Sequence, residues 1–319
     1  MKKFLKHILL FLPFFGLIYL LLLTIWGGFC PQFLRKNMLA PQGLHFSHER
    51  LQEAKTIRDI DILFLGNSRT YRGFDTRIFQ EAGFQVFNLG TSSQTFLQTE
   101  LLLRRYLQQM NPKLVVLEVS FEAFMSDGLE SAMNIIANDI HDQYTWEMLR
   151  QYDDIRLYNT WLYAAIWRFM RKNRIPWEID TFQKGLYARL KGADTYISGG
   201  FVEKELRFSS EQHNYRETSF SFNEKMFEAF ERCLDLCRQN GSEVILVLMP
   251  YPEAYYKTIR NRNYFNSRIK SHNIPYYNFN YLLPLDAVLH FYDAIHLNQH
   301  GVELFSSELV RIISSLEIL

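Results

Sequence analysis

The sequence predicts a doubly wound α/β domain behind an N-terminal apolar helix, and three observations predict it. Short apolar runs alternate with longer amphipathic stretches over much of the chain. Gly, Pro and Asn separate these runs, and an uncharged segment near the N-terminus is long enough to cross a bilayer. Near-continuous apolar strands joined by helical crossovers are typical of a parallel sheet covered on both faces.

Residues 1–30 predict a cytoplasmic tip and a membrane anchor. The run from Ile8 to Phe29 carries no charge and, as a helix, spans a hydrocarbon core of roughly 30 Å. It lacks an A-x-A-like cleavage site, and Phe29 is bulky for lipid attachment at Cys30, so we expect an uncleaved single span. The positive-inside rule places the N-terminus in the cytoplasm and the remainder outside, because the basic residues on the two sides are Lys2, Lys3 and Lys6 against Arg35 and Lys36.

Residues 31–59 contain Pro31, Pro41 and Gly43 and predict a juxtamembrane linker or short helices. A domain of alternating strands and helices follows over residues 60–319. Strands are expected at Ile62–Leu65, Gln85–Leu89, Leu114–Val119, Val244–Met249 and Tyr276–Phe279. Helices are expected at Phe74–Ala82, Gln94–Met110 and Phe222–Gln239, from Pro252 to about Ser271, and at Gln299–Leu316.

An insert of roughly ninety residues, about 121–215, separates the third and fourth strands and is too long for a simple connection. It holds four of the five tryptophans, Trp146, Trp161, Trp167 and Trp177. Apolar residues recur at helical spacing between Tyr158 and Phe169, which predicts a small helical subdomain with an aromatic core. A lid or acceptor platform over a site is the alternative interpretation.

Composition and cysteine content exclude some classes of protein. The 35 basic and 34 acidic residues leave a net charge of +1, so no electrostatic footprint indicates nucleic acid. Cys233 and Cys237 lie four apart on an expected helix, where they pack rather than form a disulfide. Neither a G-x-x-x-x-G-K-[ST] nor a G-x-G-x-x-G motif occurs, and we expect no cofactor.

The candidate site lies beyond the carboxyl ends of the strands, where doubly wound sheets place their sites. Ser68 follows the first strand in Gly66-Asn67-Ser68, Gly90 follows the second and Ser120 the third, while Asp293-Ala294-Ile295-His296 precedes the last helix. Each motif alone is weak. Together they supply a nucleophile, a base and an orienting carboxylate for acyl transfer.

These motifs resemble those of the SGNH (GDSL-type) hydrolase superfamily. The resemblance covers residues 60–319 without the insert and implies a three-layer, flavodoxin-like sheet. It implies that Ser68 is the nucleophile, His296 the general base and Asp293 its orienting carboxylate. The backbone N–H groups of Ser68 and Gly90 are suitable oxyanion donors.

The chain departs from the superfamily pattern at two places. Asn67 stands where the family often has Asp, and it is a candidate, like Gly90, for contact with the oxyanion or the substrate. The Gly-x-Asn-Asp block is missing after the third strand, where Ser120 is a candidate replacement donor. The anchor, the variant block and the insert resemble the membrane-anchored, envelope-modifying branch, which includes the alginate O-acetylation and teichoic-acid D-alanylation proteins. That likeness implies a bacterial esterase or O-acyltransferase outside the membrane, with an acyl donor, an envelope glycan or polymer acceptor, and a membrane-bound O-acyltransferase as partner.

Two other interpretations stay open. His290, Asp293, His296 and His300 are a possible metal cluster without a recognised spacing. The altered third block also fits a catalytically degenerate carbohydrate-binding or scaffolding module. Arg69 and Arg72, beside the serine, are candidates for contact with an anionic substrate in the enzyme and in the binding module.

Overall fold

The computed structural model describes residues 2–31, 33–41, 45–175, 194–209 and 214–316. Its centre is a five-stranded parallel sheet with the strand order β2-β1-β3-β6-β7. This is the order of the flavodoxin-like doubly wound fold, in which the chain reverses direction across the sheet after the second strand. The five predicted strands are confirmed with small shifts of their ends, at Ile62–Leu65 (β1), Val86–Asn88 (β2), Leu114–Glu118 (β3), Glu243–Leu248 (β6) and Tyr276–Asn278 (β7).

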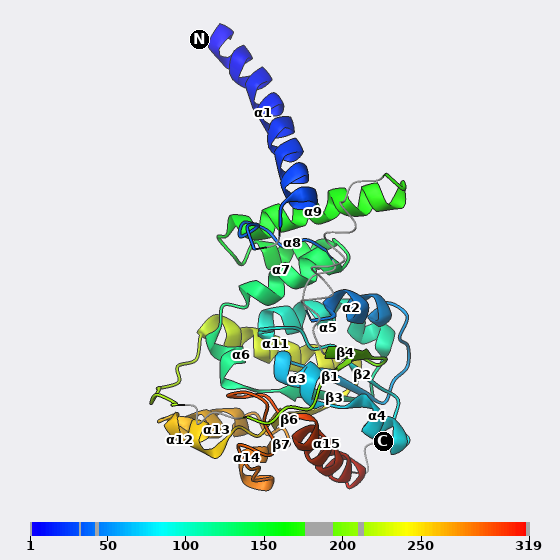
Figure 1. The fold of residues 1–319 in the computed structure, drawn as a ribbon, viewed down its shortest axis with the longest axis vertical. Coiled ribbons are helices and arrows are strands. Elements are labelled where there is room, and N and C mark those ends of the chain that lie inside the picture. The colour runs from blue at the N-terminus through cyan, green and yellow to red at the C-terminus, as the bar shows by residue number, and fades with distance from the viewer. Residues whose placement is uncertain (1, 32, 42–44, 176–193, 210–213, 317–319) are drawn as a thin grey trace.

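The sheet is buried on both faces because successive strand residues point to opposite sides. Leu63 and Val115 pack in one core with α5 (Phe96–Met110) and α11 (Glu224–Asn240). Their neighbours along the strands face the second core, which α4 (Thr76–Glu81) and α15 (Gln299–Ser314) cover. The result is the predicted three-layer α/β sandwich, which Figure 1 shows below the N-terminal helix.

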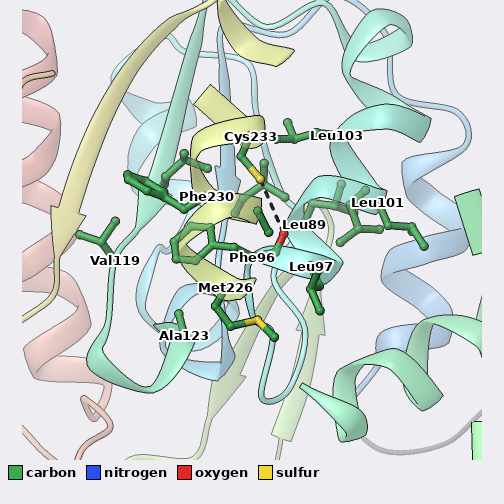
Figure 2. Packing of buried hydrophobic residues seen from close by; sticks show 14 of the residues in the cluster. Leu89, Phe96, Leu97, Leu101, Leu103, Val119, Ala123, Met226, Phe230 and Cys233 are labelled. Carbon is green, nitrogen blue, oxygen red and sulfur yellow. Dashed lines mark hydrogen bonds between the residues drawn. The ribbon is translucent and has the colours of Figure 1, made fainter. Parts of the chain in front are cut away.

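The cysteines of α11 lie inside the first core, as predicted. Figure 2 shows Cys233 between Phe96, Phe230 and Leu103, with its Sγ 3.7 Å from the carbonyl oxygen of Phe96. Cys233, Cys237 and Cys30 are all free thiols. Burial raises the pKa of Cys237 to about 12, so this thiol stays protonated and packs as a small apolar group.

Part of the predicted linker packs against the domain. Within residues 31–59 the chain forms α2 (Ser47–Ala54), whose Leu51 and Ala54 are fully buried. Arg50 on the same helix donates from Nε to the carbonyl oxygen of Gly200 over 2.8 Å. The boundary at residue 60 stays a prediction, but α2 contributes side chains to the domain core. Gly43, used in predicting the linker, lies outside the described residues.

The insert is helical over its first half and contains a β-hairpin in its second. Its helices are α6 (Phe121–Met125), α7 (Leu129–Asn138), α8 (Gln143–Leu149) and α9 (Ile155–Lys172). The antiparallel hairpin joins β4 (Asp194–Ile197) to β5 (Phe201–Lys204), a pair that the helical prediction missed. Its turn contains Gly199 and Gly200, both at positive φ, which is a hairpin signal readable from sequence. Trp177 lies outside the described residues.

The N-terminal helix α1 (Lys2–Phe29) projects from the body of the molecule (Figure 1). Its segment His7–Phe29 is the one helix among the described residues that is long and apolar enough to cross a membrane. The end of α1 that meets the body contacts α9. The remaining elements are the short helices α3 (Ser68–Gly73), α12 (Glu253–Thr258), α13 (Arg262–Lys270) and α14 (Phe279–Leu282).

Candidate active site

Helix α3 starts directly after β1 and presents Ser68 as its first residue. Asn67 caps the helix, because its Oδ1 accepts a hydrogen bond from the backbone N–H of Arg69 over 2.9 Å. Gly66, at φ +155°, makes the tight connection possible. A Cβ there would lie 2.2 Å from Thr70 Oγ1 and 2.7 Å from Glu118 Cβ, so a larger residue would displace the start of the helix. Ser68 is half-buried at this turn.

The structure brings Ser68, His296 and Asp293 into one hydrogen-bonded chain. Ser68 Oγ lies 2.8 Å from His296 Nε2, and His296 Nδ1 lies 2.9 Å from Asp293 Oδ2. Ser68 and His296 are 228 positions apart in the sequence, whereas Asp293 and His296 are three apart. Both distances suit a base that accepts the serine proton and a carboxylate that orients the ring.

Asp293 is held in place by the backbone that follows it. Its Oδ1 accepts hydrogen bonds from the N–H groups of Ile295 and His296, at 3.0 and 2.8 Å. Burial disfavours the charged carboxylate, but the hydrogen bond and positive charge of His296, with the two backbone donors, outweigh it and lower the pKa of Asp293 to about 2. Asp293 is therefore ionised at neutral pH, as a partner for a protonated histidine must be.

Tyr292 stacks on the histidine ring, a feature that sequence reasoning missed. The two ring centroids lie 5.5 Å apart with the planes 8° from parallel. Lys204 of β5 places its Nζ 4.7 Å from the centre of the Tyr292 ring on the hairpin side. The hairpin of the insert thus reaches the candidate site. The one sequence signal that could have indicated Tyr292 as a site residue was its position directly before Asp293.

The two predicted oxyanion positions differ in what they offer. Ser68 is the first residue of α3, where a backbone N–H has no partner within the helix. The N–H of Gly90 donates to Asn88 Oδ1 over 3.2 Å. Gly90 packs closely on α3, because a Cβ there would lie 3.1 Å from the carbonyl oxygen of Gly66 and from the backbone nitrogen of Tyr71.

Ser120 lies beneath Asn67. Its side chain is fully buried, and its Oγ accepts a hydrogen bond from Asn67 Nδ2 over 2.7 Å. The pair links the end of β3 to the turn after β1. This contact gives Ser120 the role of holding the capping residue of α3, which differs from the predicted role as an oxyanion donor.

Arg69 does not face a substrate, contrary to the sequence expectation. Its side chain is 2% exposed, and Nη2 donates to the carbonyl oxygen of Pro250 over 2.7 Å. The guanidinium carbon lies 3.5 Å from the centre of the Tyr251 ring. The expectation failed because α3 turns Arg69 toward the ends of β3 and β6. Arg72 is similarly enclosed and donates to Asp194 Oδ2 of the hairpin over 2.7 Å.

A buried acid lies next to Arg69. Glu118 Oε1 is 3.9 Å from Arg69 Nη1, too far for a direct hydrogen bond, and both side chains are almost completely buried. Burial raises the pKa of Glu118 to about 7, although the positive charge of Arg69 opposes the shift. Beyond Arg69, Tyr251 and Tyr255 donate their hydroxyl groups to the carboxylate of Glu122 at 2.7 and 3.0 Å. No sequence motif marks this cluster.

The four possible metal ligands do not converge. His290 Nδ1 accepts a hydrogen bond from the backbone N–H of Asp286 over 2.9 Å, while His300 packs its ring against Phe208. Within the described ranges, no group of three or more His, Cys, Asp and Glu side chains is arranged to hold a metal ion. Asp293 and His296 instead bind each other.

No protein-family model matches the sequence, and no curated protein matches it significantly. Comparison with solved structures gives similar chains. A GDSL-like lipase from Bacteroides thetaiotaomicron is 14% identical with a TM-score of 0.43, covering 85% of this chain and 99% of its own. A catalytic mutant of an acetylxylan esterase from Geobacillus stearothermophilus is 13% identical with a TM-score of 0.40, covering 82% of this chain and 97% of its own. At these values the likeness identifies neither activity nor substrate.

Proposed function

We propose that this chain is a membrane-anchored SGNH-type serine esterase or O-acyltransferase that acts on a cell-envelope glycan or polymer outside the membrane. The observation that carries the proposal is the hydrogen-bonded chain of Ser68, His296 and Asp293. It lies where β1 ends in a flavodoxin-like sheet, an edge at which such folds place their sites. Ser68, His296 and Asp293 all belong to the motifs that resemble those of the SGNH superfamily.

The geometry supports acyl transfer in two steps. His296 Nε2 accepts the hydroxyl proton as Ser68 Oγ attacks the carbonyl carbon of an acyl ester. Asp293, ionised at neutral pH, stabilises the imidazolium that forms. The tetrahedral intermediate expels its alcohol, which takes the proton from His296, and an acyl-serine remains. Water then releases the acid in an esterase, whereas a sugar or polymer hydroxyl takes the acyl group in a transferase.

The oxyanion requires donors that are strongest in the transition state. The N–H of Ser68 is available by its position in α3. The N–H of Gly90 serves as a second donor when substrate replaces its 3.2 Å contact with Asn88. This exchange is part of the proposal.

The envelope setting rests on α1 and on the resemblance to the membrane-anchored branch. His7–Phe29 is long enough to anchor the domain, and the charge bias around it favours a cytoplasmic N-terminus. A membrane-bound O-acyltransferase beside the anchor is the proposed source of acyl groups. An anchored site would act on acceptors held near the membrane surface.

Labelling of the full-length protein in detergent with a fluorophosphonate tests the activated serine. The wild type is expected to bind the probe covalently, and Ser68→Ala and His296→Ala are expected to abolish labelling. Ser126→Ala is the matched control, because Ser126 ends α6 away from the hydrogen-bonded chain, and it is expected to label as the wild type does. Undiminished labelling of a folded Ser68→Ala protein would contradict the proposal.

A second candidate function is a binding or scaffolding module without catalysis. The engagement of the Gly90 N–H by Asn88 and the burial of Ser120 favour it, because both groups already have a hydrogen-bond partner within the protein. This alternative predicts that a folded wild type resists the probe and that Ser68→Ala retains full function in the cell. The probe experiment separates the two candidates.

A further inference from the structure

Helix α9 has one side against the body and an apolar side that faces away from it. Leu157, Thr160 and Ala164 are fully buried on the inner side. At 100° per residue, the opposite side holds a stripe without a charged group. This outward stripe consists of Ile155, Tyr158, Ile166 and Phe169, whose end members are exposed and whose middle members are partly buried. Leu162, between them in sequence, packs against the cluster of Leu23 and Tyr163.

The ends of the outward stripe are strongly exposed. Ile155 is 65% exposed and Phe169 is 63% exposed. Exposed Phe33 and Leu34 follow α1 in the segment before α2. Exposed apolar side chains thus occur on α9 and on the segment that joins α1 to α2.

Contacts with α1 set the position of α9 along the anchor. The hydroxyl group of Tyr19 donates to Asn159 Oδ1. Further along α1, Gly27 lies against Tyr163 so closely that a Cβ would be 2.2 Å from its ring. Leu23 lies between these contacts in a small cluster with Tyr163. Figure 1 shows α9 running across the lower end of α1, with its C-terminal part extending to the side.

These contacts place α9 beside the half of the anchor that is nearer the domain. The segment His7–Phe29 has 23 residues. At 1.5 Å per residue it spans about 34 Å, close to the roughly 30 Å hydrocarbon thickness of a bilayer. Residues from Tyr19 to Gly27 therefore fall in the half of the bilayer nearest the domain. A helix packed beside them and crossing the anchor lies on the domain side of the bilayer midplane.

The charges near α9 agree with this location. Arg171 and Lys172 occupy its last turn, and Arg174 follows, all three exposed. At 100° per residue, Lys172 lies beside the outward stripe, the position in which basic side chains of helices in the headgroup region meet lipid phosphates. Arg171 lies on the inner side of the helix. In helices of this kind, the apolar face contacts the boundary of the acyl chains.

We propose that α9 lies flat in the outer headgroup region of the bilayer that α1 spans, with its outward stripe directed at the acyl chains. The proposal rests on the membrane anchor in the proposed function. It gives the body two attachments to the membrane in place of one. The candidate site is then held in a fixed orientation to the surface, rather than swinging on α1.

Nitroxide labels on the full-length protein in vesicles of phosphatidylcholine and phosphatidylglycerol test this arrangement. Cys30→Ser removes the most accessible thiol, and Cys233 and Cys237 are buried. Ile155→Cys and Phe169→Cys then carry the label on the stripe. Leu17→Cys in α1 reports the anchor, and Leu282→Cys in α14 is the aqueous control, since both positions are exposed and α14 lies at the far end of the body (Figure 1).

The measurement is the ratio of label collisions with oxygen, which concentrates in lipid, to collisions with a water-soluble nickel chelate. Labels at 155 and 169 are expected to favour oxygen, as the Leu17 label does, and the Leu282 label is expected to favour nickel. Nickel-dominated collisions at 155 and 169, with oxygen-dominated collisions at 17, would overturn the interfacial position of α9 and leave the anchor intact. Shielding of both stripe labels from both reagents would also overturn it, since a second copy of the chain would then cover the stripe.

Nickel-dominated collisions at Leu17 as well would overturn the anchor and the position of α9 together. Fluorophosphonate labelling of each variant provides an independent readout. Retained labelling shows that the body is folded and that the activated serine does not depend on the outcome for α9. Failure of the interfacial helix is thus distinguishable from failure of the acyl-transfer proposal.

Discussion

Ser68 and Arg69 are neighbours in α3, yet their side chains join two different polar groups. Ser68 belongs to a chain with His296 and Asp293 in which each link is a hydrogen bond of 2.8 to 2.9 Å. Arg69 belongs to a sealed group with Glu118 and Tyr251, in which the guanidinium and the carboxylate stand 3.9 Å apart. Both groups contain a residue of α3, which follows the carboxyl end of β1.

The difference between the groups is solvent access and hydrogen bonding. The carboxylate of Asp293 is 41% exposed and has several donors, and its pKa is lowered to about 2. That of Glu118 is wholly buried, and burial raises its pKa to about 7. A perturbed pKa near a sheet edge therefore does not by itself identify a reaction centre. A continuous chain of hydrogen bonds that ends at an accessible nucleophile is the stronger criterion.

The largest effect is expected from Ser68→Ala, which removes the nucleophile and leaves Arg69 in place. Esterase activity on an activated acyl ester should fall by about 10⁴-fold or more, because the covalent route is lost. Steady-state hydrolysis measures the change, and circular dichroism checks the fold. Activity of Ser68→Ala within a few-fold of wild type would contradict the assignment of Ser68, rather than Arg69, to the reaction centre.

Asp293→Asn is expected to lower the rate by about 10² to 10⁴-fold, since the ring of His296 loses the anion that orients it and stabilises its charge. Its cost in stability should stay below about 1 kcal/mol at pH 7, because a carboxylate this exposed is screened by solvent. Folded Asp293 has the lower pKa, so its contribution is present above about pH 4 and is lost as the pH falls toward 2. Parallel kinetics and urea unfolding separate the rate from the stability.

Arg69→Met is expected to affect stability first. It leaves Glu118 buried without its positive partner, and the free energy of unfolding at pH 8 should drop by about 3 to 5 kcal/mol. Arg69→Met combined with Glu118→Leu should recover much of this loss, because no buried charge remains. Urea unfolding of the two variants measures the difference. A double variant as unstable as the single one would show that the guanidinium acts through packing on Tyr251 alone.

Glu118→Gln gives the smallest expected effect and reports the pH dependence of the sealed group. Folded Glu118 has a pKa of about 7, above its ordinary value of 4.5, so the folded state retains a proton that the unfolded state releases. Its contribution to stability is complete below about pH 4.5 and declines as the pH rises to about 7. Between pH 4.5 and pH 8, the free energy of unfolding of the wild type should therefore fall by up to about 3 kcal/mol more than that of Glu118→Gln. Urea unfolding at the two pH values measures the difference. An equal change in the free energy of unfolding of both proteins would show that a group other than Glu118 titrates in this pH range.

Much of the fold was readable from the sequence because its signals are local. Apolar runs such as Leu114–Glu118 mark strands buried on both faces, and α11 ends at Asn240, one residue beyond the predicted end at Gln239, where Gly241 caps it. Two recognisable motifs indicated Ser68, Asp293 and His296. The hairpin escaped because helical periodicity near Trp161 was extended across the whole insert, although Gly199 and Gly200 carried a turn signal.

The sequence by itself determined the order of strands and helices, the apolar N-terminal helix and the serine, histidine and aspartate that could act together. The tertiary structure alone decided that Arg69 is enclosed, that Tyr292 stacks on His296 and that α9 lies against α1. Strand and helix patterns arise from neighbouring residues, whose periodicity the chain displays directly. The surroundings of Arg69 come from Glu118 and Pro250, far along the chain, and only the packing of α3 on the sheet brings them together.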